Sequence, residues 1–355
     1  MADARISEHA RLIVDYCCKV KRDDFVLIVG TPEAQELVAE MAAKIGRAGA
    51  HYVFLDQDPY IERAYRLSAD DQTLSSMPIQ ILELARSTDV IVQIISSSNS
   101  QEESDVPPGK VRLASGAMGQ VIRIMLGKRW NVTLHPTRAL AQDAKMSFEG
   151  YRNFVYNATL RDWPKLVSEM TVLRDKMAAA KQVRLIGKET DIAFSIEGRT
   201  PVVDGGEVNL PGGEVFVSPV DSTVSGTVYF DLPVVYADRD IKGARLTFRN
   251  GEAVESDAEV GSDLLREMLT VDDGAKRIGE LGIGMNRGID RFTRNILFDE
   301  KMRDTIHMAV GNAYEETGGT NKSAIHIDMI KSMKEGGAVY FDGIPVYENG
   351  KFVWE

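Results

Sequence analysis

In the first half of this chain, segments whose apolar residues recur at helical spacing alternate with short continuous apolar runs. Apolar residues recur every three or four positions from Ile6 to Val20, and a continuous apolar run follows at Phe25–Gly30. The alternation continues with a helix opened by Thr31 and Pro32 and running to about Gly46, strands at Tyr52–Leu55, Asp89–Ile95, Val121–Leu126 and Val132–His135, and helices at Ile79–Arg86 and Leu160–Ala180. Strands that alternate with helices predict a parallel sheet flanked by helices.

The second half is rich in short strands separated by Gly, Pro and Asn. Eight of the 30 glycines precede residue 181, and the other 22 follow. The dipeptides at 250–251 and 349–350 are both Asn-Gly, which predicts tight hairpin turns. The expected elements are strands at Val183–Ile186, Ile192–Ile196, Val215–Val217, Thr227–Phe230 and Arg245–Phe248, and a helix at Gly261–Leu269. We therefore expect an α/β N-terminal domain with a mostly parallel sheet at 1–180, followed by a strand-rich α+β domain at 181–355.

Length and charge exclude several classes of protein. A chain of 355 residues can form two domains, each with its own core, and its net charge of −11 does not suit a nucleic-acid-binding face. The longest apolar strings, such as Phe25–Val29 and Val90–Ile95, are far shorter than the roughly 20 residues of a membrane span. Asp3, Arg5 and Glu8 do not fit a secretory signal. We expect a cytoplasmic enzyme that binds neither nucleic acid nor membrane.

Common nucleotide and nucleophile motifs are incomplete in this sequence. Gly30 is not followed by the G-x-G-x-x-G pattern, and the segment GGTNKS at 318–323 lacks the first glycine of a phosphate-binding loop. No G-x-S-x-G motif occurs. Cys17 and Cys18 are adjacent on an apolar helical face, so we expect both to be buried structural residues.

The histidines give more information about chemistry. We expect His9 to be solvated on the first helix, and His51 and His135 to be structural residues at strand ends. His326 and Asp328 lie in the otherwise apolar run AIHIDMI, and on a strand their side chains project to the same face. Burying both is costly unless each has a partner, which a metal ion would supply. A hydrogen-bonded His–Asp pair at a sheet edge is the alternative.

Three more residues fit the metal hypothesis. His307 is the one histidine of the apolar run TIHMAV, while Glu214 and Glu280 each stand beside glycines at or within an apolar strand. Taken singly, each glutamate is also explained as a charge at a strand end. Together with His326 and Asp328 they form a set of two Glu, two His and one Asp, which suits two divalent ions because carboxylates bridge close cations.

Four segments carry a specific resemblance. They are NLPGGEVFVSP (209–219), GELGIGMN (279–286), NILFDEKMRDTIHMAVGNAY (295–314) and SAIHIDMI (323–330). These segments resemble the motifs of the M29 metallo-aminopeptidases, the thermophilic aminopeptidase T/S group, which is leucyl aminopeptidase-like. The resemblance implies two divalent ions, zinc, cobalt or manganese, in a catalytic C-terminal domain. By motif, the metal ligands would be Glu214, Glu280, His307, His326 and Asp328, with Tyr314 completing the site.

The resemblance also implies a reaction. The expected activity is removal of the N-terminal residue from short peptides by a water that two metal ions activate. Tyr314 would donate a hydrogen bond to the oxyanion, and Glu214 or Glu280 would share the work of a general base. A homodimer is expected on the same grounds.

Two other functions stay open at this point. A mononuclear Fe(II) ring-cleaving dioxygenase on the same scaffold would need only His307, His326 and Asp328, and would have no use for Glu214 and Glu280. The other is a catalytically inactive metal-binding protein, against which the presence of the tyrosine argues.

Overall fold

The chain divides into two compact units. The computed structural model describes residues 3–236 and 239–355. Unit 1 is Met1–Leu160 with Gly206–Pro211, and unit 2 is Arg161–Gly205 with Gly212–Glu355. The long helix predicted at Leu160–Ala180, at the end of the first domain, is α10 (Trp163–Ala179), and it belongs to unit 2. Within the described residues, no helix is long and apolar enough to cross a membrane.

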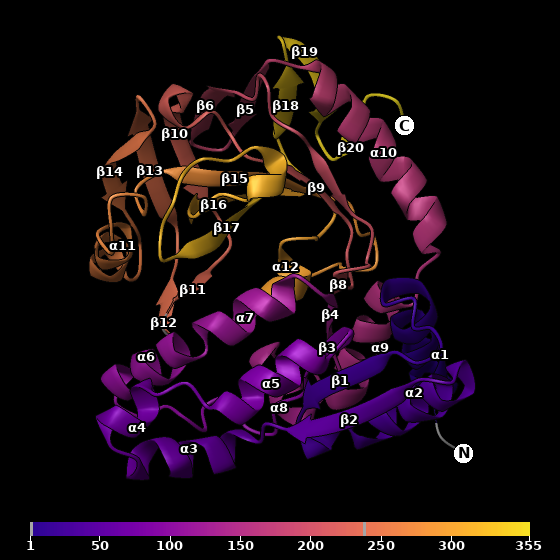
Figure 1. Cartoon of the computed structure of the whole chain (residues 1–355). Coiled ribbons are helices and arrows are strands. Elements are labelled where there is room, and N and C mark those ends of the chain that lie inside the picture. Colours follow the sequence, from indigo (N-terminus) through magenta and orange to yellow (C-terminus); the bar gives the residue numbers. More distant parts are fainter. Residues whose placement is uncertain (1–2, 237–238) are drawn as a thin grey trace. The chain divides into compact units, whose positions relative to one another are not determined.

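Unit 1 is built on a five-stranded parallel sheet, as predicted (Figure 1). In spatial order its strands are β2 (His51–Asp56), β1 (Phe25–Gly30), β3 (Val90–Ile95), β4 (Arg129–Leu134) and β8 (Asn209–Leu210). The successive residues 26–29 of β1 are all buried. Because successive strand side chains point to opposite faces, both faces of the sheet are covered.

Helices surround this sheet. They are α1 (Ala4–Arg11), continued by a π-helix (Leu12–Cys17), a 3-10 turn (Pro32–Ala34), α2 (Gln35–Ala48), α3 (Pro59–Ser68), α4 (Asp71–Ser75), α5 (Ile79–Ser87), α6 (Pro108–Ala117), α7 (Gly119–Leu126), α8 (Arg138–Asp143) and α9 (Phe148–Thr159). The prediction of a strand at Val121–Leu126 is wrong, because this run forms α7. Val121 and Ile124 are spaced as helix neighbours and pack with Leu82 of α5.

A second correction concerns His9. It was expected to be solvated, but its side chain is fully buried, and its Nε2 lies 2.7 Å from the hydroxyl of Thr133 in β4. Burial lowers the pKa of His9 to about 3. Cys17 and Cys18 are buried, as predicted, and burial raises the pKa of Cys18 to about 12.

Unit 2 is strand-rich and antiparallel, as predicted. One sheet has the order β14-β13-β10-β6-β5-β18-β19-β20, a second has the order β17-β16-β15-β9-β7, and β11 pairs with β12. The strands are β5 (Gln182–Gly187), β6 (Thr190–Ser195), β7 (Val202–Asp204), β9 (Glu214–Val217), β10 (Ser225–Phe230), β11 (Val234–Tyr236), β12 (Arg239–Ile241), β13 (Ala244–Arg249), β14 (Glu252–Asp257), β15 (Ile278–Gly284), β16 (Thr305–Gly311), β17 (His326–Ser332), β18 (Ala338–Phe341), β19 (Ile344–Glu348) and β20 (Lys351–Phe352).

Unit 2 also contains short helices and two Asn-Gly hairpin turns. Besides α10, the helices are α11 (Ser262–Leu269) and α12 (Ile296–Asp299), with 3-10 turns at Asp221–Thr223 and Glu315–Thr317. The two Asn-Gly dipeptides turn the β13–β14 and β19–β20 hairpins. All four of these residues have positive φ, between 48° and 84°, which Asn and Gly tolerate best.

Candidate metal centre

Four adjacent strands of one sheet bring the five predicted ligands together. Glu214 begins β9, Glu280 lies in β15, His307 in β16, and His326 and Asp328 in β17. Their ligand atoms form two groups, and within each group the atoms lie within 4.8 Å of one another. One group is Glu214, Glu280 and His307, and the other is Glu280, His326 and Asp328. Glu280 therefore belongs to both.

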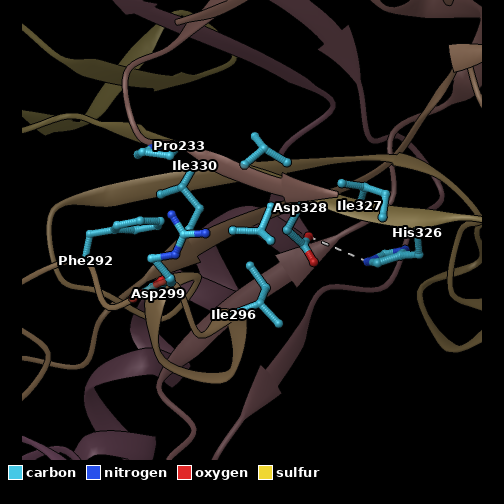
Figure 2. A pocket seen from close by; sticks show the side chains of 11 residues that line it. Pro233, Phe292, Ile296, Asp299, His326, Ile327, Asp328 and Ile330 are labelled. Atoms are coloured by element: carbon cyan, nitrogen blue, oxygen red, sulfur yellow. Dashed lines mark ion pairs between the residues drawn. The ribbon is translucent and has the colours of Figure 1, made fainter. Parts of the chain in front are cut away.

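The two oxygens of Glu280 face different imidazoles. Its Oε1 lies 3.5 Å from Nε2 of His307, and its Oε2 lies 3.1 Å from Nε2 of His326. The outer carboxylates flank this arrangement. Glu214 Oε2 is 3.3 Å from Nε2 of His307, and Asp328 Oδ1 is 3.6 Å from Nε2 of His326, the pair marked by the dashed line in Figure 2.

Backbone carbonyls orient both imidazoles. Nδ1 of His307 lies 3.0 Å from the carbonyl oxygen of Glu300, and Nδ1 of His326 lies 2.7 Å from that of Asn312. A carbonyl oxygen only accepts, so Nδ1–H donates in each case and Nε2 faces the carboxylates. Metal-ligating histidines are commonly fixed in this way by a hydrogen bond at the other ring nitrogen.

Two carboxylate oxygens of the cluster accept no hydrogen bond. These are Oε2 of Glu214 and Oδ1 of Asp328, and both atoms are buried. A buried carboxylate oxygen without a hydrogen bond is costly unless a cation lies beside it. The mixed nitrogen and oxygen donors of the cluster are those that zinc, cobalt and manganese accept. The residues present therefore fit divalent metal ions.

The electrostatics of the cluster favour positive charge at its centre. Burial alone would lower the pKa of His307, but the carboxylates of Glu214 and Glu280 raise it to about 10. Burial would also lower the pKa of His326, but the nearby carboxylates of Asp328 and Glu280 raise it to about 11. Burial opposes ionisation of Asp328, yet the nearby imidazole of His326 lowers the pKa of that carboxyl to about 2.

A buried lysine that was not predicted from the sequence lies beside these ligands. Lys301 is fully buried, and its Nζ lies 3.3 Å from Glu214 Oε1 and 3.7 Å from Asp204 Oδ2, and it also contacts the carboxylate of Glu300. Burial would lower the pKa of Lys301, but these carboxylates raise it well above the usual value. Lys301 and Glu300 lie in the connection between α12 and β16, where no strand or helix period shows which way a side chain points.

Glu300 is part of the same charged environment. Burial raises the pKa of Glu300 to about 8. The positive charge of Lys301 opposes this shift, and the negative charges of Glu214 and Asp328 add to it. The only sequence signal for Glu300 was its place in the motif NILFDEKMRDTIH, which does not distinguish it from the other charged residues there.

A glycine makes room for the His307 ring. Gly282 of β15 is the cross-strand partner of His307, and a Cβ atom at this position would lie 2.0 Å from both Cε1 and Nε2 of the ring. Any side chain at residue 282 would therefore displace the imidazole.

Tyr314, the sixth residue predicted from the sequence, borders the cluster. Its ring centroid lies 4.8 Å from that of His326 and 5.7 Å from that of Phe216. Burial of the phenol and the charge of Glu280 raise the pKa of Tyr314, so its hydroxyl keeps its proton. A protonated hydroxyl at the edge of the cluster can donate a hydrogen bond.

Known proteins share the sequence pattern and the fold. Aminopeptidase 2 of Geobacillus stearothermophilus is 23% identical over 413 aligned residues, covering 99% of this chain and 98% of that protein. The solved structure of wild-type AmpT from Thermus thermophilus has a TM-score of 0.86 at 23% identity and covers 99% of each chain. That of a 2,5-dihydroxypyridine dioxygenase from Pseudomonas putida KT2440 has a TM-score of 0.66 at 13% identity, covering 100% of this chain and 99% of the other. These likenesses confirm the predicted fold class.

The family comparison covers nearly all of the sequence. The pattern of the thermophilic metalloproteases (M29) matches residues 2–352, including all four segments on which the resemblance was based. This chain belongs to the thermophilic metalloprotease (M29) family.

Proposed function

We propose that this protein is a metallo-aminopeptidase that holds two divalent ions and removes the N-terminal residue from short peptides. The observation that carries the proposal is the pair of ligand groups that share Glu280. A carboxylate with one oxygen toward each of two imidazoles suits a bridge between two close cations. The six predicted site residues all lie in unit 2, which supports a catalytic C-terminal domain.

In this proposal each ion has three protein ligands. Glu214, Glu280 and His307 would hold one ion, and Glu280, His326 and Asp328 the other. The unbonded oxygens of Glu214 and Asp328 support this assignment, because each belongs to a different group. Zinc, cobalt and manganese all suit this donor set, and metal analysis of the purified protein decides among them.

When bound, two such ions lower the pKa of a water molecule toward neutrality and polarise the scissile carbonyl. The protein residues supply the remaining functions. Glu214 or Glu280 accepts a proton from the attacking water, and the Tyr314 hydroxyl donates a hydrogen bond to the oxyanion that forms. The raised pKa of Tyr314 supports its role as a donor, since a phenolate has no proton to donate.

Metal analysis combined with hydrolysis assays tests this function. We expect two divalent ions per chain and release of p-nitroaniline from leucyl-p-nitroanilide. N-acetyl-leucyl-p-nitroanilide is the matched control and should stay intact, because an aminopeptidase requires a free α-amine. Cleavage of both substrates would contradict an exopeptidase.

The same experiment separates the other two hypotheses. The second candidate is the mononuclear Fe(II) ring-cleaving dioxygenase, and the Pseudomonas putida dioxygenase shows that this fold also occurs in a dioxygenase. One iron per chain without peptide hydrolysis would favour that candidate, and bound metal without turnover of any substrate would favour an inactive binding protein. We also propose a cytoplasmic homodimer, and light scattering after gel filtration measures the oligomeric state.

A further inference from the structure

A pocket of about 150 Å³ in unit 2 borders the metal centre. His326 and Asp328 form part of its lining, and the rest comes from Pro233, β11, β17 and the segment 292–299. Figure 2 shows His326 at one end of the pocket and Phe292 and Pro233 at the other, with Asp328 between them. The pocket therefore begins at two of the proposed ligands and extends away from them.

The pocket is mainly apolar. Val234, Phe292, Ile296, Ile327 and Ile330 provide hydrocarbon surface around it. Binding an apolar side chain against this lining is favourable, because it removes apolar surface from water. A charged side chain would lose its hydration there, which is unfavourable.

The two charged residues of the lining beyond the ligands already have partners. The Arg294 guanidinium forms an ion pair with Asp240 at 2.7 Å. The Asp299 carboxylate accepts hydrogen bonds from the backbone N–H and the hydroxyl of Thr293, at 2.7 and 2.8 Å. The charge of Arg294 is therefore neutralised within the protein, and the Asp299 carboxylate is 1% exposed and hydrogen-bonded to Thr293, so neither residue calls for an oppositely charged substrate.

We infer that this pocket receives the side chain of the substrate's N-terminal residue and selects apolar side chains up to the size of phenylalanine. The inference rests on the proposed aminopeptidase function. In such a substrate the Cα of the first residue carries the free amine and is bonded to the scissile carbonyl carbon. Its side chain begins two bonds from both the scissile carbonyl carbon and the free amine, whereas the second residue's side chain begins three bonds from that carbon and five from the amine. The first side chain is therefore the one nearer to the ions.

The volume sets the upper limit of size. A cavity of about 150 Å³ lined by Leu, Ile and Phe side chains holds benzene. Leucine, methionine and phenylalanine side chains match this volume, and the indole of tryptophan exceeds it. Alanine fits but leaves most of the apolar lining without contacts.

Two substitutions with opposite effects on pocket size test the inference. Ile296→Phe narrows the pocket, and because Ile296 is 48% exposed the larger ring does not disturb a packed core. Phe292→Ala widens it. The readout is kcat/KM for aminoacyl-p-nitroanilides with Ala, Leu, Phe and Trp. One methylene in an apolar pocket changes discrimination about 10- to 200-fold. We expect a Leu/Ala ratio above about tenfold in the wild type, a roughly tenfold fall of this ratio in Ile296→Phe, and a similar rise of the Trp/Leu ratio in Phe292→Ala.

Ile344→Phe is the matched control. Ile344 is an isoleucine of β19 that is 67% exposed and does not line this pocket, so its substitution should leave both ratios unchanged. Unchanged ratios in both pocket variants would overturn the inference. It would also be overturned if the substitutions altered selection among Leu-Ala, Leu-Leu and Leu-Phe dipeptides instead. No turnover of any substrate by the metal-loaded wild type would refute the proposed function, which is a different result.

Discussion

Replacing the buried Lys301 by methionine tests whether this lysine balances the charge of the metal centre. Methionine keeps much of the length of the side chain and removes the ammonium group. The Nζ of Lys301 lies within 4 Å of carboxylate oxygens of Glu214, Asp204 and Glu300, and the lysine side chain is 0% exposed. In the variant, these carboxylates face one another without the cation.

The expected cost is large in the metal-free protein. Removing one partner of a buried ion pair costs about 3–5 kcal/mol of unfolding free energy, because the remaining charge is buried and unpaired. For a unit of this size, each kcal/mol lowers the unfolding midpoint by roughly 2–4 °C, so the shift should be roughly 6–20 °C. Divalent ions bring back positive charge, and a ligand that binds only the folded state stabilises it. Metal loading should therefore raise the midpoint more in the variant than in the wild type.

Thermal unfolding with and without chelator measures both effects. Lys322→Met is the control, because Lys322 forms an exposed ion pair with Glu315 at 2.6 Å, and exposed pairs contribute about 0–1 kcal/mol. The reasoning is refuted if metal-free Lys301→Met unfolds within the range of this control. It is also refuted if metal ions stabilise Lys301→Met no more than the wild type.

Four further predictions concern single residues. Glu280→Gln should lose at least one metal ion and nearly all activity with the fold intact, because Glu280 belongs to both ligand groups; full metal content with near-normal turnover would rule out the shared ligand. Tyr314→Phe should keep its metal and lose roughly 10²–10³ in kcat, since one oxyanion donor is removed; a loss of metal content instead would contradict this role. Gly282→Ala should lower metal affinity measured by chelator competition, because its Cβ would clash with the His307 ring; unchanged affinity would refute the contact. Lowering the pH from 7 to 5 should reduce stability in denaturant titrations. His9 takes up a proton near pH 6.5 in the unfolded state but only near pH 3 in the folded state. Its contribution to the free energy of unfolding is therefore complete above pH 6.5 and declines by about 2 kcal/mol by pH 5. In His9→Gln this decline should be smaller by that amount, and an equal decline would disprove the assignment.

The parts of the fold that could be predicted are those with an unambiguous period. A strand places alternate residues on one face, so His326 and Asp328 had to project together once their segment was identified as a strand. The parallel sheet followed from apolar runs that alternate with helices. The six-residue run Val121–Leu126 fits either a buried strand or one face of a helix, and its packing on α5 decides the outcome.

Other residues of the site region could not be placed because their positions depend on tertiary contacts. Lys301 and Glu300 lie in a connection between elements, where the path of the backbone sets the direction of a side chain. His9 lies on a helix whose face toward β4 is known only once the helix is packed against the sheet. In both cases the residue type suggested exposure, and the buried partner that makes burial tolerable is more than 80 residues away in the sequence.

Several glycines of unit 2 lie opposite the proposed metal ligands in the sheet. Three of the proposed ligands pair across the sheet with glycine, namely His307 with Gly282, His326 with Gly311, and Glu214 with Gly284. At each of these glycines a Cβ would lie about 2 Å from a neighbouring atom. A cluster of rings and carboxylates within a sheet requires strands and loops to approach closely around it, and residues without side chains permit this. Gly282 makes room for a ligand ring itself, whereas Gly284 and Gly311 make room for the backbone carbonyls of Met302 and Ile325 beside the ligand strands.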